Sequence, residues 1–208
     1  MDSLRRLEEI FGHFPGIGPR QAKRFVYYIL SRSPAFTKEL VNLMEEVRKD
    51  ANECERCHRF FMSKNGKAAH GTTASMPICP TCSDMSRDAS QLMVVARDSD
   101  FESVEKSGAY RGLYFVLGGT VPILDKEPEK RIRLNQLLER ASAEAASLKE
   151  IILSLNTTPE GENTADIVRD SLKSQPAKIT VLGKGLSTGA ELEYVDADTI
   201  RNALQNRH

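Results

Sequence analysis

The sequence predicts an α/β protein in which a helical hairpin and a four-cysteine module precede a mostly parallel sheet. From residue 91 onward, short apolar segments of strand length alternate with amphipathic segments of helical length. Upstream lie two Cys-x-x-Cys pairs, and before them apolar residues recur at helical spacing on both sides of a turn rich in glycine and proline. Strands that alternate with helices are typical of a parallel sheet covered on both faces.

We expect four consecutive regions in the 208 residues. Residues 1–52 form a helical hairpin region that binds DNA, and residues 53–84 form the cysteine module. Residues 89–176 form the α/β domain. Residues 177–208 form a C-terminal strand and helix through which the chain self-associates.

In the first region, two short helices flank the turn Pro15-Gly16-Ile17-Gly18-Pro19, and Pro19 suits the first position of the second helix. A third helix is expected from Thr37 to about Asp50, because its apolar residues form one stripe.

The expected strands of the α/β domain are residues 92–95, 113–117, 151–155 and 179–182, and the expected helices lie near residues 99–107, 128–147 and 163–174. Beyond them, Glu191 to Val195 alternates polar and apolar side chains, which predicts an edge strand with one solvent-exposed face. Such an edge would dock on a neighbouring subunit. Asp196 or Asp198 would cap a final helix.

Charge is balanced over the whole chain but not along it. The 29 Lys and Arg residues equal the 29 Asp and Glu residues, so net charge does not indicate a polyanionic partner. Residues 1–32 nevertheless hold six basic and three acidic residues, which fits either local anion binding or a solvated helix face. No stretch approaches the ~20 apolar residues that span a bilayer, and no signal core follows Met1, so we expect a cytoplasmic protein without membrane contact.

All four cysteines lie in the two Cys-x-x-Cys pairs. Each pair can place two thiolates on one side of a tight turn, and two facing turns supply the tetrahedral sulfur set that structural Zn²⁺ prefers. We therefore predict one structural Zn²⁺ per chain, held by Cys54, Cys57, Cys79 and Cys82. Two disulfides, or haem attachment at the Cys-x-x-Cys-His sequence that ends at His58, are alternatives that suit an exported protein. Four sulfur ligands leave no position for a reactive water.

The turn before the second helix has the features of a phosphate site. Gly16 and Gly18 permit a tight turn with exposed amides, and the helix N-terminus adds partial positive charge. Arg20, Lys23 and Arg24 follow, where they could reach neighbouring phosphates. A plain turn is the alternative, but the whole segment resembles the helix-hairpin-helix of DNA-binding proteins. It lacks an array of side chains that would read base edges, so we predict DNA binding without sequence preference.

Taken in order, these features resemble the RecR family of recombination mediators. The resemblance rests on Pro15 to Arg20, the four-cysteine module, Asn156 to Glu162, and Gly189 to Asp196, and it covers nearly the whole chain. It implies a homo-oligomer, a ring-shaped tetramer, that binds DNA, cooperates with RecO and RecF, and helps load RecA onto single-stranded gaps. The 21 residues between the cysteine pairs (58–78) exceed the spacing expected for the family, and Lys64 to Lys67 is typical of a β-hairpin turn there.

The α/β part resembles a Toprim domain, whose active members hold Mg²⁺ with one Glu after the first strand and an Asp-x-Asp pair after the third. These positions fall on Ala96, Asn156 and Thr158, none of which carries a carboxylate. A hard cation needs such charge, so we expect a non-catalytic protein. RecR-like proteins usually keep the glutamate that Ala96 replaces.

Four acidic residues remain near those positions: Asp98, Asp100, Glu160 and Glu162. They could form a weak metal site or an acidic patch that faces a protein partner. Alternatively, they stabilise helix N-termini, where Asp98 or Ser99 could also act as a cap. The rival functions are a Toprim phosphotransferase that acts on nucleic acid and a zinc-ribbon adaptor that binds protein. ATP binding is not expected, because no G-x-x-x-x-G-K-[ST] sequence is present.

Overall fold

The computed structural model describes residues 2–62, 77–125 and 127–207. These residues form two compact units. The helical unit comprises residues 2–51 with Met62, and the larger unit comprises residues 52–61, 77–125 and 127–207. The hairpin turn predicted at Lys64 to Lys67 lies outside the described residues. No described helix combines the length and apolar character needed to cross a membrane.

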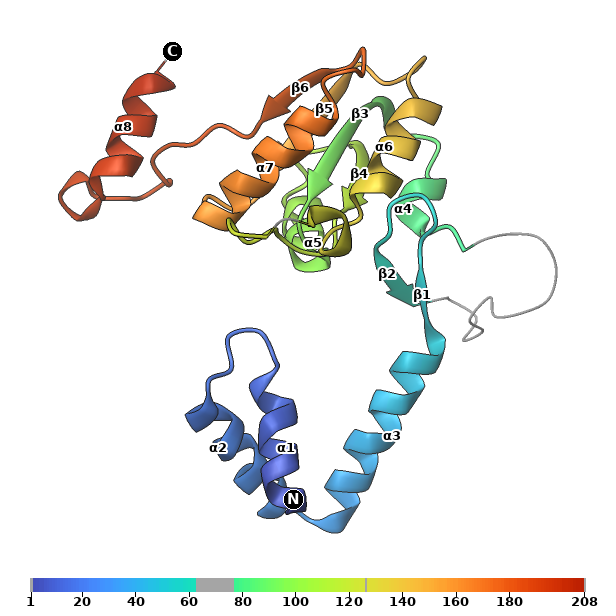
Figure 1. The fold of residues 1–208 in the computed structure, drawn as a ribbon, viewed down its shortest axis with the longest axis vertical. Coiled ribbons are helices and arrows are strands. Elements are labelled where there is room, and N and C mark those ends of the chain that lie inside the picture. Colours follow the sequence, from blue (N-terminus) through green and yellow to red (C-terminus); the bar gives the residue numbers. More distant parts are fainter. Residues whose placement is uncertain (1, 63–76, 126, 208) are drawn as a thin grey trace. The chain divides into compact units, whose positions relative to one another are not determined.

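The helical unit contains α1 (Ser3–Gly12), α2 (Pro19–Leu30) and α3 (Pro34–Asp50) (Figure 1). The α1 and α2 helices pack against each other as the predicted hairpin, with Ala22 and Val26 buried and the Phe11 and Phe25 rings in edge-to-face contact. The third helix begins at Pro34, before the predicted Thr37, because the Ser33 hydroxyl accepts the Phe36 N–H and caps it.

The larger unit opens with short paired strands and a short helix, and continues as an α/β domain. Its elements, the first of which begins at the boundary between the units, are β1 (Ala51–Glu53), β2 (Phe60–Met62), α4 (Pro80–Ser83), β3 (Asp88–Val95), α5 (Asp98–Ser107), β4 (Gly112–Val116), η1 (Pro128–Lys130), α6 (Leu134–Ala143), β5 (Glu150–Ser154), α7 (Pro159–Ser171), β6 (Lys178–Val181), η2 (Leu192–Tyr194) and α8 (Ala197–Gln205).

The four long strands form a parallel sheet in the order β4-β3-β5-β6, which confirms the predicted fold class. Leu92 and Val94 of β3 belong to the core under α6 and α7, whereas Met93 and Val95 pack with Phe101 of α5 on the opposite face (Figure 1). Because Leu92–Val95 of β3 and all of β4 are buried on both faces, these segments are continuous and almost entirely apolar instead of alternating.

The helix expected near residues 128–147 is interrupted. It consists of η1 and the shorter α6, and the two are separated at Arg133. The Arg133 N–H donates to the Leu117 carbonyl at the end of β4, at 2.9 Å, and therefore not to a carbonyl of the preceding helical turn. A tertiary hydrogen bond thus interrupts the helix that the apolar periodicity alone predicts to be continuous.

The prediction of a strand from Glu191 to Val195 is wrong. Leu192–Tyr194 form the 3-10 turn η2, in which the Tyr194 N–H donates to the Glu191 carbonyl at 3.1 Å. No described strand pairs with this segment, so its backbone groups form local hydrogen bonds instead. Leu192 and Tyr194 are 65% and 80% exposed. Of the two predicted caps for the last helix, Asp196 is the one that caps α8, by accepting from the Asp198 and Thr199 amides.

Candidate metal centre and nucleic-acid interface

The structure brings the four cysteines together. Their sulfur atoms lie within 4.8 Å of one another, and all four residues are buried. In the first turn, the His58 N–H donates to the Cys54 carbonyl at 2.7 Å, with His58 in the left-handed conformation at φ 59°. In the second, Cys79 precedes α4, and the Cys82 N–H donates to the Cys79 carbonyl at 3.1 Å. Each Cys-x-x-Cys pair thereby places both sulfurs on one side of its turn.

Electrostatics in the cluster favour a cation. Hydrogen bonds from the Cys57, Cys79 and Cys82 thiols hold the pKa of Cys54 far below its usual range, whereas the hydrogen bond to Cys54 raises the pKa of Cys57. The hydrogen bond to Cys54 raises the pKa of Cys79, but those from Cys57 and Cys82 outweigh it and lower this pKa to about 7. The pKa of Cys82 is raised by its hydrogen bond to Cys54, so negative charge gathers on Cys54 and Cys79 while Cys57 and Cys82 keep their protons. A divalent cation at the centre would displace those protons and neutralise the resulting thiolates. Among the described residues this is the group of His, Cys, Asp and Glu side chains that could hold a metal ion.

His58 is not part of the sulfur cluster, although it follows Cys57 directly. Its ring packs edge-on against Phe115, with 5.2 Å between the ring centroids, and its Nδ1 lies 2.9 Å from Oε1 of Glu53. His58 therefore connects the first cysteine turn to β4 of the larger sheet.

The three Toprim carboxylate positions have structural roles. Ala96 is fully buried at the end of β3. The Thr158 hydroxyl accepts the Gly161 N–H at 3.2 Å and caps α7. Gly161 lies so close to Asn156 that an added Cβ would be 2.0 Å from the Asn156 carbonyl oxygen. These positions supply helix capping and close packing, and they offer no anionic oxygen to a cation.

The four predicted acidic residues form no group that could hold a metal within the described chain, so the weak metal site is not supported. Asp98 Oδ1 accepts the Phe60 N–H at 2.8 Å. Asp100 Oδ2 accepts the N–H of Arg97, the N-cap residue of α5, at 2.9 Å, so neither Asp98 nor Ser99 is the cap.

The other two acids of that set, Glu160 and Glu162, lie in the first turn of α7, and Glu162 pairs with Lys184 at 2.5 Å. The acidic patch that faces a partner stays a prediction.

The turn between α1 and α2 offers unused hydrogen-bond donors. Gly16 has φ 75°, in the left-handed region that favours glycine, and the Ile17 N–H closes the turn on the Phe14 carbonyl at 3.0 Å. Within the described residues, the N–H groups of Gly16, Gly18 and Arg20 have no acceptor. A Cβ added at either glycine would meet no atom within 4 Å, so the space beside these donors is open.

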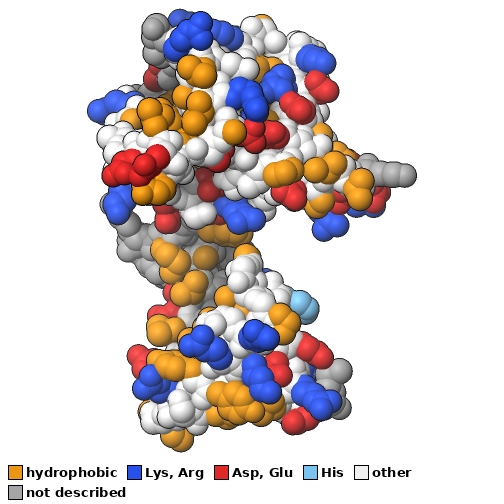
Figure 2. Space-filling view, turned by 90° about the vertical axis from the view of Figure 1, so that its left-hand side faces the viewer, with side chains coloured by type: hydrophobic (Ala, Val, Ile, Leu, Met, Phe, Trp, Pro, Cys, Tyr) orange, Lys and Arg blue, Asp and Glu red, His pale blue; other side chains and the backbone are white. Residues whose placement is uncertain are grey.

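The cations after this turn are exposed and uncompensated. Arg20, Lys23 and Arg24 form no ion pair with any described residue. Arg24 only donates to Gln21 Oε1 at 3.3 Å, and Lys23 lies 5.9 Å from the centroid of the Tyr27 ring. Figure 2 shows Lys and Arg side chains beside apolar ones on the helical unit.

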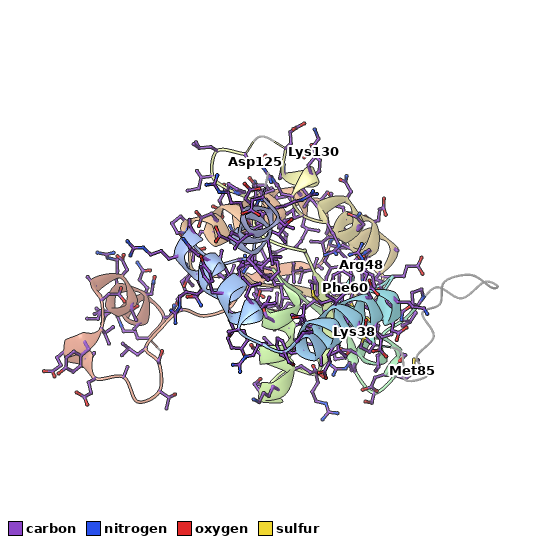
Figure 3. The ribbon with its side chains drawn as sticks, turned by 90° about the horizontal axis from the view of Figure 1, so that it is seen from below. Lys38, Arg48, Phe60, Met85, Asp125 and Lys130 are labelled. Carbon is purple, nitrogen blue, oxygen red and sulfur yellow. The ribbon has the colours of Figure 1, made fainter. Side chains whose placement is uncertain are left out.

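Several basic residues of the larger unit are instead paired with neighbouring acids. On the loop beyond β4, Lys130 pairs with Glu127 at 2.5 Å and Arg131 pairs with Asp125 at 2.6 Å; Figure 3 shows Asp125 and Lys130 on this loop. Local acids thus neutralise these cations. The combination of open backbone donors with unpaired cations therefore makes the hairpin a candidate anion site.

The sequence did not lead us to predict one buried charged residue. Arg140 of α6 lies among Leu134, Leu137 and Ala141 on the buried face of its helix, and its Nη1 donates to the Arg56 and Tyr114 carbonyls at 2.6 and 2.8 Å. A cation at helical spacing with apolar residues was the available signal.

Comparisons with known proteins cover nearly the whole length of the chain. A Toprim domain model matches residues 90–183, and a RecR C-terminal model matches residues 185–208. The chain is 35% identical over 204 residues to "Recombination protein RecR" of Cereibacter sphaeroides, which covers 98% of this chain and 95% of that protein. It is 34% identical over 205 residues to "Recombination protein RecR" of Bifidobacterium longum subsp. infantis, with 99% and 95% covered.

Proposed function

Because the chain belongs to the RecR family of recombination proteins, we propose that it is a non-catalytic, DNA-binding recombination mediator that acts in the repair of single-strand gaps. It works in the cytoplasm with RecO- and RecF-type proteins and thereby promotes loading of RecA. It functions as a homo-oligomer, a tetramer in the form that binds DNA.

The observation that carries this proposal is the arrangement of the α1–α2 hairpin. Free backbone donors at Gly16, Gly18 and Arg20 lie in open space at the start of α2. The unpaired side chains of Lys23 and Arg24 follow within the next two turns. Backbone amides and a helix N-terminus bind phosphate oxygens without reading bases, and flanking cations add affinity through counterion release. The hairpin therefore binds DNA through the phosphates of the DNA backbone.

The absence of catalysis is supported by the Toprim positions. Ala96 is buried and apolar, and Thr158 uses its hydroxyl to cap α7. Phosphoryl transfer in this kind of domain depends on carboxylates that hold a divalent cation, and these positions supply none.

The metal of the cysteine cluster is Zn²⁺. Four buried sulfur donors within 4.8 Å of one another match a closed tetrahedral thiolate site, and soft thiolates favour Zn²⁺ over hard cations. When bound, the ion links the two cysteine turns and leaves no open position for chemistry. The cysteines hold the metal, and the metal stabilises the module.

The test combines DNA affinity with its salt dependence. Fluorescence anisotropy on a gapped duplex compares the native chain with Arg20→Ala/Arg24→Ala at several salt concentrations. If each arginine neutralises one phosphate, the slope of log K against log[salt] falls by ~1.4 to 1.8 per engaged subunit. The matched control is Arg169→Ala/Lys173→Ala. It removes one cation on α7 and one just beyond it, each of which pairs with an aspartate of α7. It is expected to keep the native slope.

Two outcomes would contradict this proposal. Weaker binding with an unchanged slope would mean that Arg20 and Arg24 shape the hairpin without contacting phosphate. Unchanged affinity in the double variant would move the DNA surface elsewhere. Oligomeric state and metal content serve as controls for folding, and both should remain at the native values.

A further inference from the structure

The β4 strand is an edge of the sheet, yet it is fully buried. It has β3 on one side and no described strand on the other in the order β4-β3-β5-β6, and each of its five residues, Gly112 to Val116, is buried. Its sequence is almost entirely apolar. An uncovered edge of this kind would pair readily with a strand of another molecule. Something other than a strand must therefore occupy its outer backbone groups.

Three arginines and one cysteine turn occupy that edge. The Gly112 carbonyl accepts from Arg87 Nη1 at 3.1 Å, and the Tyr114 carbonyl accepts from Arg140 Nη1 at 2.8 Å. The Val116 N–H donates to the Cys57 carbonyl at 2.8 Å, and the Val116 carbonyl accepts from Arg133 Nη1 at 3.3 Å. These groups belong to alternate residues of β4, as expected for one edge of a strand.

Arg140 connects this edge to the first cysteine turn. Its side chain is 7% exposed, and the same Nη1 that binds the Tyr114 carbonyl also donates to the carbonyl of Arg56, between Cys54 and Cys57, at 2.6 Å. Glu144 completes the arrangement, because it accepts from both Arg56 and Arg140. One buried cation thus holds a carbonyl of the strand and a carbonyl of the metal-binding turn together.

A second set of contacts acts at the carboxyl end of β4. Oε1 of Glu53 lies 2.9 Å from His58 Nδ1 and 3.2 Å from Arg133 Nε, and the His58 ring packs on Phe115. The cysteine turn is therefore held against β4 at the middle and at the end of the strand. Hydrogen bonds also join this turn to the second cysteine turn, from the Glu55 N–H to the Pro77 carbonyl at 3.1 Å and from Arg56 Nη1 to the Cys82 carbonyl at 3.2 Å.

We propose that the metal-bound cysteine module is the cover of the β4 edge, with Arg140 as its buried link, and that loss of the metal frees β4 to pair with β4 of a second copy. Without the metal, only hydrogen bonds such as those of Glu55 and Arg56 join the two cysteine turns, so the Cys57 and Arg56 carbonyls are held less firmly against β4. The coupling is reciprocal in free energy, so weakening the Arg140 link also weakens metal binding, which speeds metal release because such affinity changes fall mostly on the dissociation rate. The proposal rests on a metal at the four cysteines, which elemental analysis tests separately from DNA binding.

Hydrogen exchange measures the state of the edge directly. The metal-loaded full chain is compared before and after chelation, in segments covering residues 112–117 and, as the internal control, residues 150–154 of β5. Exchange in the β4 segment is expected to rise at least about tenfold, the factor that one charged hydrogen bond contributes, while β5 stays protected. Light scattering should then report association beyond the oligomer that the metal-loaded chain forms. Unchanged exchange of β4 in the metal-free chain, or equal loss of protection in β5, overturns the proposal.

A variant tests the link without removing the metal. Arg140→Met fills a similar volume without leaving a buried charge, and metal transfer to a chelating dye should become about tenfold faster. Arg140→Lys keeps the cation but not the planar guanidinium, and should restore part of the native rate. Arg169→Met, in an exposed ion pair of α7, is the matched control and should release metal at the native rate. Native release from Arg140→Met, or a purified chain without metal, refutes the proposal.

Discussion

Replacement of Gly161 by alanine is expected to destabilise the larger unit, because the first turn of α7 passes directly over the loop after β5. An added Cβ would lie 2.0 Å from the carbonyl oxygen of Asn156 and 2.8 Å from its carbonyl carbon. Both are backbone atoms, so no change of rotamer relieves the overlap. Either the loop or the start of α7 must move, and movement of α7 also weakens the bond from the Gly161 N–H to the Thr158 hydroxyl.

The size of the effect follows from two opposing contributions. Overpacking of a closely packed site costs ~1 to 3 kcal/mol, and an overlap with rigid backbone belongs at the upper end. Alanine in place of glycine within a helix returns up to ~1 kcal/mol. The net loss is therefore ~2 kcal/mol in the free energy of unfolding. At ~2 to 4 °C for each kcal/mol, Tm should fall by ~4 to 8 °C.

Thermal unfolding followed by circular dichroism measures this change, with Gly183→Ala as the matched control. Gly183 lies in the loop after β6, and a Cβ added there would meet no atom within 4 Å. That variant should melt within about 1 °C of the native chain. Equal Tm values for Gly161→Ala and Gly183→Ala would refute the close approach of α7 to Asn156.

Three further predictions concern metal, chemistry and assembly. Elemental analysis should find about one Zn²⁺ per chain, and Cys57→Ser should release it and lower Tm, because metal binding contributes to folding; a folded, metal-free native chain with four titratable thiols would contradict this. With Mg²⁺ or Mn²⁺ the purified chain should not cleave DNA, since Ala96, Asn156 and Thr158 provide no carboxylate; cleavage that Asp98→Ala abolishes would reverse this conclusion. Size exclusion with light scattering should give a tetramer, or a dimer that closes into one, and a strict monomer at micromolar concentration, with and without DNA, would count against it.

The sequence alone determined the features that depend on neighbouring residues. The segments Leu92–Val95 and Leu113–Leu117 were identifiable as strands because both faces are buried, which makes every side chain apolar. The cysteine set was equally local, since Cys-x-x-Cys spacing places two sulfurs on one side of a turn. The same holds for the turn at Gly16, where the left-handed conformation requires glycine.

Only the tertiary structure decided which segments pair as strands and which distant residues form hydrogen bonds. The alternation from Glu191 to Val195 had the period of a strand, but a strand also needs a pairing partner, and periodicity contains no information about one. The Arg140 guanidinium reaches the carbonyl of Arg56, which is 84 positions away in sequence. Such a contact depends on where the chain returns in space, because hydrogen bonds are satisfied by distance and direction and not by sequence spacing.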